Sequence, residues 1–342
     1  MSFSHSNPSK ELSFQLNTPV TFIIFNRPDT TLRVFKEIEK IKPKKLLIIA
    51  DGPRIEKKGE VELVKKTRSI IDRVDWDCEV LTNFSKKNMG CKNRVSSGLD
   101  WVFKQVEESI ILEDDCLPNL SFFRFCQELL SRYRDDQRIG IISGVNHLSD
   151  LPNYQMRNND SYIFSKANHI WGWATWRDRW QKTYDVDLKS WPIIKGEGWL
   201  KDLCRGKELE VKQLTEALDQ VYKKKTNAWA AQWTFSCLLH GRLSIIPCTN
   251  LICNIGFGKN STHTHDLSSW LANMPTGTVN FPLIHPLGMI ESYEYDLRVK
   301  QRLAWRPSYL QNLVTRLKAP NRRKRIKAKI EKSLEKLKTC LF

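Results

Sequence analysis

The sequence predicts an α/β fold, a mostly parallel β-sheet with helices on both faces, followed by a basic helical C-terminal tail. Between residues 20 and 143, short apolar runs of strand length alternate with segments of helical periodicity. Runs such as residues 46–50 are apolar throughout, as expected of strands buried on both faces of a parallel sheet. Polar residues follow directly where three of these runs end. At 342 residues the chain is long enough to bury a full core.

The first half is predicted to contain five strands separated by four helices. The strands are predicted at residues 20–25, 45–50, 78–82, 109–112 and 139–143, and the helices at residues 30–41, 56–71, 91–106 and 118–133. In the first helix Leu32, Phe35 and Ile38 share one face, as an amphipathic helix packed on a sheet requires. In such sheets ligands bind beyond the carboxyl ends of the strands, where the strand order reverses.

The second half has a less regular pattern. Strands are predicted at residues 162–165, 243–246 and 251–255, one or two charged helices at 200–223, and an aromatic helix at 227–240. Trp173, Trp176 and Trp180 are spaced for one face of a helix. Residues 256–266 form a loop rich in Gly, Ser, Thr and His.

Composition excludes several classes of protein. No window approaches the roughly 18 uninterrupted apolar residues of a membrane helix, and the N-terminus lacks the pattern of a signal peptide. The nine cysteines form no Cys-x-x-Cys pair, which favours reduced packing residues over a zinc site or a disulfide framework. We therefore expect a cytoplasmic protein.

The net charge of +17 is concentrated toward the C-terminus, where residues 316–338 carry 11 Lys and Arg against two Glu. Apolar residues recur there at helical spacing, at Ile326, Ile330, Leu334, Leu337 and Leu341. The segment reads as a terminal helix packed on the body, or as a basic amphipathic helix on an anionic membrane surface. The charge would also suit nucleic acid, but we expect no nucleic-acid partner because no RNA- or DNA-binding motif accompanies it.

The acidic triplet Glu113, Asp114 and Asp115 is the most informative motif. Adjacent carboxylates at the end of an apolar strand repel one another and require a compensating cation. Mg²⁺ or Mn²⁺ supplies one, because these ions bind a few carboxylates together with substrate phosphates. A solvated acidic turn or a helix N-cap is the alternative interpretation. Asn26 and Arg27 follow the first strand and Asp51 and Gly52 the second, so three strand ends carry polar groups to one edge of the sheet.

The chain resembles glycosyltransferases of the GT-A fold, including family 2 and the N-acetylglucosaminyltransferase I type. The resemblance covers roughly residues 18–265. It is carried by blocks in a fixed order, namely residues 25–28, 50–53, the acidic triplet with residues 118–123, and residues 171–173, 227–233 and 254–258. Asn88, Gly90 and Gly98 also fit the spacing of a segment that lines the nucleotide pocket in family 2, although Arg94 and Ser96 replace its usual small residue and Asn.

This resemblance implies a role for each matching residue. Arg27 and Asp51 would contact the base and ribose of a nucleotide, Glu113 and Asp114 the nucleotide or sugar, and Asp115 the metal. His263 would lie on a loop over the diphosphate as a metal ligand or phosphate donor, unless it is merely exposed. Trp171, Gly172, Trp173 and Trp229 would form the acceptor side, because indole faces stack on sugar rings. Core packing is the alternative for Trp171 and Trp173.

One departure from the family pattern concerns the base. In the N-acetylglucosaminyltransferase I type an acidic pair in the Trp-flanked segment supplies the base that deprotonates the acceptor hydroxyl, but this chain has Ala230 and Ala231 there. Methyl groups cannot accept a proton, and a base contributes roughly 10²–10⁴-fold in rate. Asp185, Asp187 and Glu197 are weak candidates for this role. The alternative is a catalytically impaired protein that binds nucleotide sugars or a partner.

Together these patterns predict an N-terminal extension (residues 1–17), a GT-A domain (18–290) and a basic tail (291–342). Within the domain, residues 18–145 would bind the nucleotide sugar and residues 146–290 the acceptor. The expected activity is metal-dependent transfer from a nucleotide-diphosphate donor, with a UDP-sugar favoured, to a hydroxyl of a glycan or lipid-linked acceptor in surface glycan biosynthesis. The expected location is cytoplasmic, peripheral on the inner membrane face if the tail contacts the membrane.

Overall fold

The computed structural model describes residues 14–156, 159–258 and 269–304. The chain divides into two compact units, Met1–Tyr293 and Glu294–Phe342. The second unit contributes most of one described helix, α10 (Tyr293–Ala304). The predicted basic tail helix, from residue 305 onward, lies outside the described residues.

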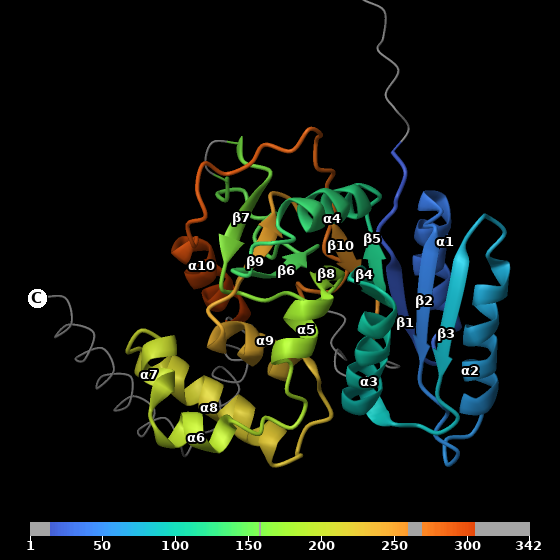
Figure 1. Cartoon of the computed structure of the whole chain (residues 1–342), viewed down its shortest axis with the longest axis horizontal. Coiled ribbons are helices and arrows are strands. Elements are labelled where there is room, and N and C mark those ends of the chain that lie inside the picture. The colour runs from blue at the N-terminus through green and yellow to red at the C-terminus, as the bar shows by residue number, and fades with distance from the viewer. Residues whose placement is uncertain (1–13, 157–158, 259–268, 305–342) are drawn as a thin grey trace, which may run out of the picture. The chain divides into compact units, whose positions relative to one another are not determined.

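An eight-stranded sheet organises the first unit (Figure 1). Its order is β3 (Glu79–Phe84), β2 (Lys45–Ala50), β1 (Val20–Ile24), β4 (Glu108–Glu113), β8 (Trp173–Trp176), β6 (Ile139–Ser143), β9 (Leu243–Pro247) and β7 (Tyr162–Ser165). The first four strands are parallel, β8 is antiparallel to both of its neighbours, and β7 is antiparallel to β9. Parallel strands buried on both faces explain the continuous apolar runs in the sequence.

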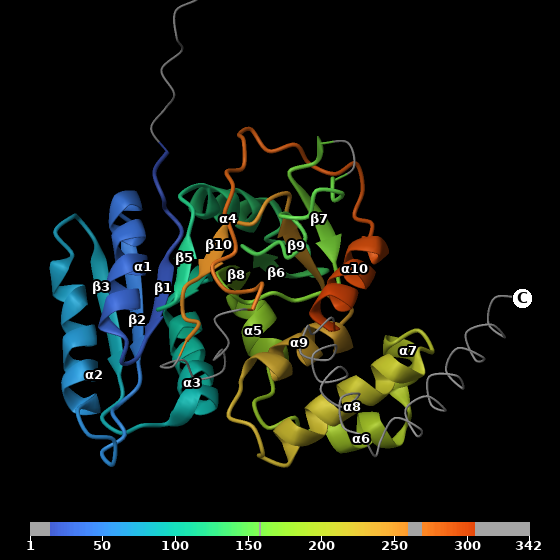
Figure 2. The same cartoon turned by 180° about the vertical axis from the view of Figure 1, so that it is seen from behind.

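Helices cover both faces of this sheet, as Figures 1 and 2 show from opposite sides. On one face, α1 (Pro28–Ile41) and α4 (Ser121–Arg132) pack on alternate side chains of β1, β2 and β4. On the other, α3 (Gly90–Gln105), α5 (Arg177–Thr183) and α9 (Ala230–Leu239) cover the remaining side chains of the same strands. The predicted α/β class is confirmed, with the Rossmann-like arrangement that the GT-A resemblance implies.

The helical prediction for Trp173 and Trp176 is wrong, because both lie in strand β8 and only Trp180 lies in a helix. In a strand, residues three apart point to opposite faces. Accordingly, Trp173 packs in the core beneath α3 and α9, whereas Trp176 packs beneath α4. The spacing of three fits a helical face and two opposite faces of a strand equally well, and pairing with β4 and β6 decided between them.

Several element ends also differ from prediction. The predicted helix at residues 56–71 is shorter, as α2 (Glu60–Arg68) followed by a 3₁₀ turn (Ser69–Arg73). Residues 116–118 form a short strand, β5 (Cys116–Pro118), which pairs with β10 (Ile252–Asn254) in a second sheet, so the next helix starts at Ser121. Proline lacks the N–H that a continuous helix needs, yet it fits at the end of an edge strand.

Two short helices and one longer helix form a lobe of their own, which lies at the lower edge of Figures 1 and 2. They are α6 (Trp191–Gly196), α7 (Trp199–Leu203) and α8 (Glu208–Tyr222). The α6–α8 lobe has a separate small core, in which Trp191 and Leu218 pack against Phe235 of α9. Among the described helices, we find none with the length and apolar character needed to cross a membrane.

Candidate active site

The site begins where β1 and β4 end side by side. Arg27, directly before α1, forms ion pairs with two members of the acidic triplet, with Asp114 and, at 2.9 Å, with Asp115 Oδ2. The backbone N–H of Phe25 donates a further hydrogen bond to Asp114 at 3.3 Å. Since β1 and β4 are adjacent parallel strands, their carboxyl ends meet and bring these groups together. Arg27 thus supplies part of the positive charge that the triplet requires.

The small sheet places Gly256 against this ion pair. Ile255 N–H donates to the carbonyl of Asp115 at 2.9 Å, and Gly256 N–H donates to the side chain of Asn254 at 2.9 Å. A Cβ at Gly256 would overlap Asp115 Oδ2 and come within 2.7 Å of Arg27 Nη1. Glycine at this position therefore lets the backbone approach the acidic triplet closely.

Replacing Gly256 by alanine should separate Arg27 from Asp115 and lower the stability of the protein. We expect the free energy of unfolding to fall by about 1–3 kcal/mol, the range for forcing extra atoms into a packed site. Denaturant unfolding measures this change. Gly196→Ala is the matched control, because a Cβ there meets nothing within 4 Å. Equal stability of the two variants would show that the close approach has no energetic role.

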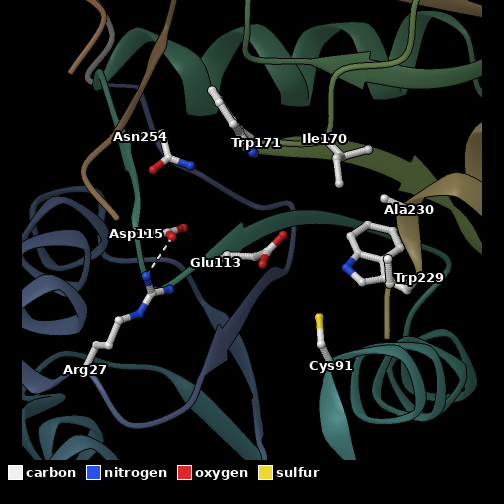
Figure 3. Close-up of a pocket in the computed structure, with 10 residues that line it drawn as sticks. Arg27, Cys91, Glu113, Asp115, Ile170, Trp171, Trp229, Ala230 and Asn254 are labelled. Carbon is white, nitrogen blue, oxygen red and sulfur yellow. Dashed lines mark ion pairs between the residues drawn. The ribbon is translucent and has the colours of Figure 1, made fainter. Parts of the chain in front are cut away.

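A cavity of about 190 Å³ opens beside the triplet (Figure 3). It is lined by the polar side chains of Arg27, Glu113, Asp115 and Asn254 and by six further residues, Cys91, Ile170, Trp171, Ala228, Trp229 and Ala230. The Glu113 carboxylate points toward the side of Ile170 and Trp229, whereas Arg27 pairs with Asp115 (Figure 3). The cavity therefore places a carboxylate that is not paired with Arg27 opposite an indole ring.

Burial alters the acidity of the groups around this cavity. Burial, reinforced by the charges of Asp115 and Asp114, raises the pKa of Glu113 to about 8. Burial also raises the pKa of Asp114 to about 6, although Arg27 opposes the shift. The thiol of Cys91 is buried near Glu113 and Asp51, and its pKa is raised to about 12, so it is protonated at neutral pH. The raised pKa values of Glu113 and Asp114 mean that these buried carboxylates bind a proton more readily than exposed ones do.

The raised Glu113 pKa makes stability depend on pH. Between the ordinary carboxyl pKa and about 8 the folded protein binds more protons than the unfolded chain, so stability falls as pH rises through this range. Without divalent cations we expect a loss of at least about 2 kcal/mol, since each pKa unit corresponds to about 1.4 kcal/mol. Denaturant unfolding from pH 5 to pH 8.5 measures it. In Glu113→Gln the free energy of unfolding should fall much less between pH 5 and pH 8.5. An equal fall in this variant would show that a group other than Glu113 causes the pH dependence.

Asp51, at the end of β2, holds the start of α3. Its carboxylate accepts hydrogen bonds from the backbone N–H groups of Gly52 (2.8 Å), Met89 (2.9 Å) and Gly90 (3.0 Å). Asn88 donates to the carbonyl of Gly52 at 2.8 Å. The structure thus brings together Asp51, Gly52, Asn88 and Gly90 in one hydrogen-bonded cluster next to Cys91. Their contact with a nucleotide stays a prediction.

Asn26 and Gly98 are placed differently. Asn26 donates to Glu60 Oε1 at 2.9 Å, and Glu60 also pairs with Arg54. Gly98 lies inside α3, where a Cβ would come within 2.6 Å of the Ile49 side chain in β2. Neither residue lines the cavity. Close packing of a helix on a strand is therefore sufficient reason for glycine at position 98.

The four residues predicted for the acceptor side divide between cavity wall and core. Trp171 and Trp229 line the cavity. Trp173 is fully buried and stacks on Trp229 at 5.7 Å between ring centroids, so it supports the wall from behind. Gly172 has φ +60°, and a Cβ there would overlap Ile252. Packing thus accounts for Trp173 and Gly172, whereas Trp171 and Trp229 line the cavity.

The structure brings none of the weak base candidates into the cavity wall. Asp185 accepts hydrogen bonds from the N–H groups of Asp187 and Lys189, Asp187 pairs with Lys92 at 3.3 Å, and Glu197 is exposed after α6. Ala230 lines the cavity, whereas Ala231 packs toward the α6–α8 lobe. Among the described residues, Glu113 and Asp115 are the acids in the wall. His263 lies outside the described residues.

Sequence reasoning missed the residues that hold Trp229 in place. The Asn227 side chain accepts a hydrogen bond from Lys92 N–H at 2.9 Å, in the first turn of α3. Tyr184 donates to the carbonyl of Trp229 at 3.3 Å and also bonds Ser96 at 2.8 Å. This bond joins residues 135 positions apart, so the sequence around Asn227 carried no signal for it. Nothing in the sequence indicated Tyr184.

The donor set fits a hard divalent cation. Mg²⁺ and Mn²⁺ favour oxygen ligands and are commonly held by one or two carboxylates plus substrate phosphates. Asp115 and Glu113 both line the cavity, so two carboxylates face the space that a metal and a diphosphate would occupy. Within the described residues, no group of three or more His, Cys, Asp or Glu forms a complete metal site. A metal would therefore depend on ligand oxygens to complete its coordination.

No protein-family model matches the chain, and no curated protein matches it in sequence. Two of the similar solved structures are mouse xyloside xylosyltransferase 1 in its apo form and apo UDP-glucose pyrophosphorylase. The first is 9% identical, covers 77% of this chain and 96% of its own, and has a TM-score of 0.32. The second is 10% identical, covers 67% and 90%, and has a TM-score of 0.30. TM-scores in this range do not establish a shared fold, so the chemistry of the cavity has to be inferred from its own residues.

Proposed function

We propose that the protein is a metal-dependent glycosyltransferase of the GT-A type, related to family 2 or to the N-acetylglucosaminyltransferase I type. It would transfer a sugar from a nucleotide-diphosphate donor, with a UDP-sugar favoured, to a hydroxyl acceptor in surface glycan biosynthesis. The observation that carries the proposal is one cavity at the carboxyl end of the sheet that is lined by two carboxylates, Glu113 and Asp115, and by two indole rings, Trp171 and Trp229. Carboxylates suit a metal–diphosphate, and indole faces suit a sugar ring.

Charge balance supports a metal at this site. Arg27 is the cationic residue in the cavity wall among those described, and it is already paired with Asp114 and Asp115. A diphosphate brought to this wall would meet carboxylates with little free positive charge to attract it. A Mg²⁺ or Mn²⁺ ion held by Asp115 would supply that charge and stabilise the leaving nucleotide diphosphate.

The chain's own residues would position the donor. Asp51 and the residues bonded to it lie next to Cys91, which lines the cavity. Together with Arg27 they would contact the nucleotide. Glu113 would accept hydrogen bonds from sugar hydroxyls, because its carboxylate faces the side of the cavity where Trp229 lies. Trp229, held by Trp173 and Tyr184, would exclude water from the sugar face.

The test is a thermal-shift screen of UDP-, GDP- and dTDP-sugars with Mn²⁺, followed by transfer assays with the best donor. A ligand at 100 times its dissociation constant stabilises the folded state by about 2.7 kcal/mol, so one nucleotide class should raise the melting temperature by several degrees. The shift should disappear with EDTA. Absence of any metal-dependent shift across the three nucleotides would refute the proposal.

A second candidate is a catalytically impaired nucleotide-sugar-binding protein. It is favoured by Ala230, which lines the cavity and falls in the segment where the N-acetylglucosaminyltransferase I type, which the sequence resembles, carries an acidic pair. This candidate predicts donor binding without transfer to any acceptor tested. Ala230→Asp separates the two, because a gain in turnover would indicate a lost base, and no gain would favour a base elsewhere.

A further inference from the structure

The α6–α8 lobe carries an exposed surface of lysines and large apolar side chains. We call it the lysine–apolar patch and define it by segments 189–201 and 219–225. Three large apolar residues are exposed in it: Ile193 (63% exposed), Trp199 (49%) and Tyr222 (43%). The same segments contain six exposed lysines, at positions 189, 195, 201, 223, 224 and 225, against Glu197 and Asp219.

The two segments lie side by side. Lys195 of α6 and Lys223 after α8 both reach the carboxylate of Asp219, at 2.8 and 3.1 Å. Asp219 also accepts a hydrogen bond from the indole of Trp191 at 3.0 Å, which ties α6 to α8. Trp191 and Leu218 bury the inner sides of these helices. The solvent-exposed sides of α6 and α8 therefore carry basic and apolar side chains next to one another.

The corner between α6 and α7 projects from the lobe. A Cβ at Gly196 or at Gly198 would meet nothing within 4 Å, so open space surrounds this turn. Ile193 and Trp199 lie on either side of it and are both exposed. An isoleucine and a tryptophan beside a projecting turn can enter an adjoining apolar phase without rearrangement of the lobe.

The composition of the patch distinguishes between partners. Lysine is depleted in protein–protein interfaces, and a nucleic acid would leave Ile193 without a role. Lysines with Trp, Tyr and an aliphatic residue are instead the combination found at membrane interfaces, where ammonium groups meet anionic headgroups and apolar side chains enter the acyl boundary. We propose that the lysine–apolar patch docks the folded body on an anionic phospholipid surface.

The patch lies close to the cavity along the chain. Ala228, which lines the cavity, follows Lys225 by three residues, a span of at most about 11 Å. Docking through this surface would hold the cavity near the headgroups. The inference itself requires only the lobe, and it stands or falls separately from the proposed transferase activity.

The experiment is co-sedimentation of the full chain with phosphatidylcholine vesicles and with vesicles containing about one-third phosphatidylglycerol. Each lysine near an anionic surface contributes on the order of 1 kcal/mol. We therefore expect Lys201→Glu/Lys224→Glu/Lys225→Glu to weaken binding to the anionic vesicles more than tenfold, while leaving the Asp219 pairs intact. The control is Lys57→Glu/Lys58→Glu/Lys65→Glu, which changes the net charge equally at exposed positions of the first unit outside the lobe.

A second variant tests the apolar part. Ile193→Ser keeps every charge and should weaken binding roughly fivefold or more, because one exposed aliphatic side chain no longer enters the bilayer. Equal losses in the two lysine variants would assign binding to total charge and overturn the proposal. The proposal would also be overturned if neither patch variant changed vesicle binding, or if the protein did not prefer the anionic vesicles. A third contrary outcome is that the patch variants disrupt a dimer of the protein and do not affect lipid binding.

Discussion

Replacing Arg27 by methionine is expected to destabilise the folded chain by about 3–5 kcal/mol, the usual consequence of leaving a buried charge without its partner. The Asp114 side chain is only 5% exposed, and Arg27 is the cation paired with it. Methionine retains much of the side-chain volume and removes only the charge and the donors. Denaturant unfolding at pH 8 measures the loss.

This loss should be smaller in acid. The pKa of Asp114 is already raised to about 6 by burial, and removing Arg27 raises it further. In the variant Asp114 would be protonated at pH 5, so the penalty for an unpaired charge largely disappears there. The double variant Arg27→Met/Asp114→Asn should likewise regain much of the stability at pH 8.

A surface pair provides the control for Arg27. Arg138 pairs with Asp136 at 2.7 Å, but its side chain is 68% exposed, so Arg138→Met should leave the free energy of unfolding almost unchanged. If Arg27→Met costs no more than Arg138→Met, the acidic triplet does not depend on Arg27, and the electrostatic account of the site is wrong.

Asp115→Asn is expected to remove the metal-dependent part of donor binding and to reduce transfer by at least about 100-fold. An amide binds a hard divalent cation far less strongly than a carboxylate does. Because Arg27 keeps its pair with Asp114, the fold should survive. The measurements are the Mn²⁺-dependent thermal shift with the best donor, and the transfer rate.

Asp187→Asn is the matched comparison, because Asp187 is an exposed acid paired with Lys92 outside the cavity wall. It should retain both donor binding and transfer. The opposite pattern, with Asp187→Asn inactive and Asp115→Asn active, would move the chemistry away from the acidic triplet.

The lining of the cavity shows where prediction from the sequence succeeded and where it had to fail. Arg27, Glu113 and Asp115 were predicted because each follows an apolar run, and parallel strands necessarily bring such ends to one edge. Cys91 and Asn254 were not predicted for the cavity, because their positions depend on the packing of α3 and on the pairing of β10 with β5. Pairing between segments more than 100 residues apart has no local signal.

The sequence by itself determined the alternation of strands and helices and the polar ends of β1, β2 and β4, because periodicity and burial are local properties of the chain. Only the tertiary structure decided that Trp173 is a core residue of strand β8, that Trp229 is a cavity wall, and that Asp51 binds the start of α3. In each case the local sequence allowed the side chain more than one position, in the core, at the cavity or at the surface. Which neighbour it met depended on strand order and helix packing, which are global properties of the fold.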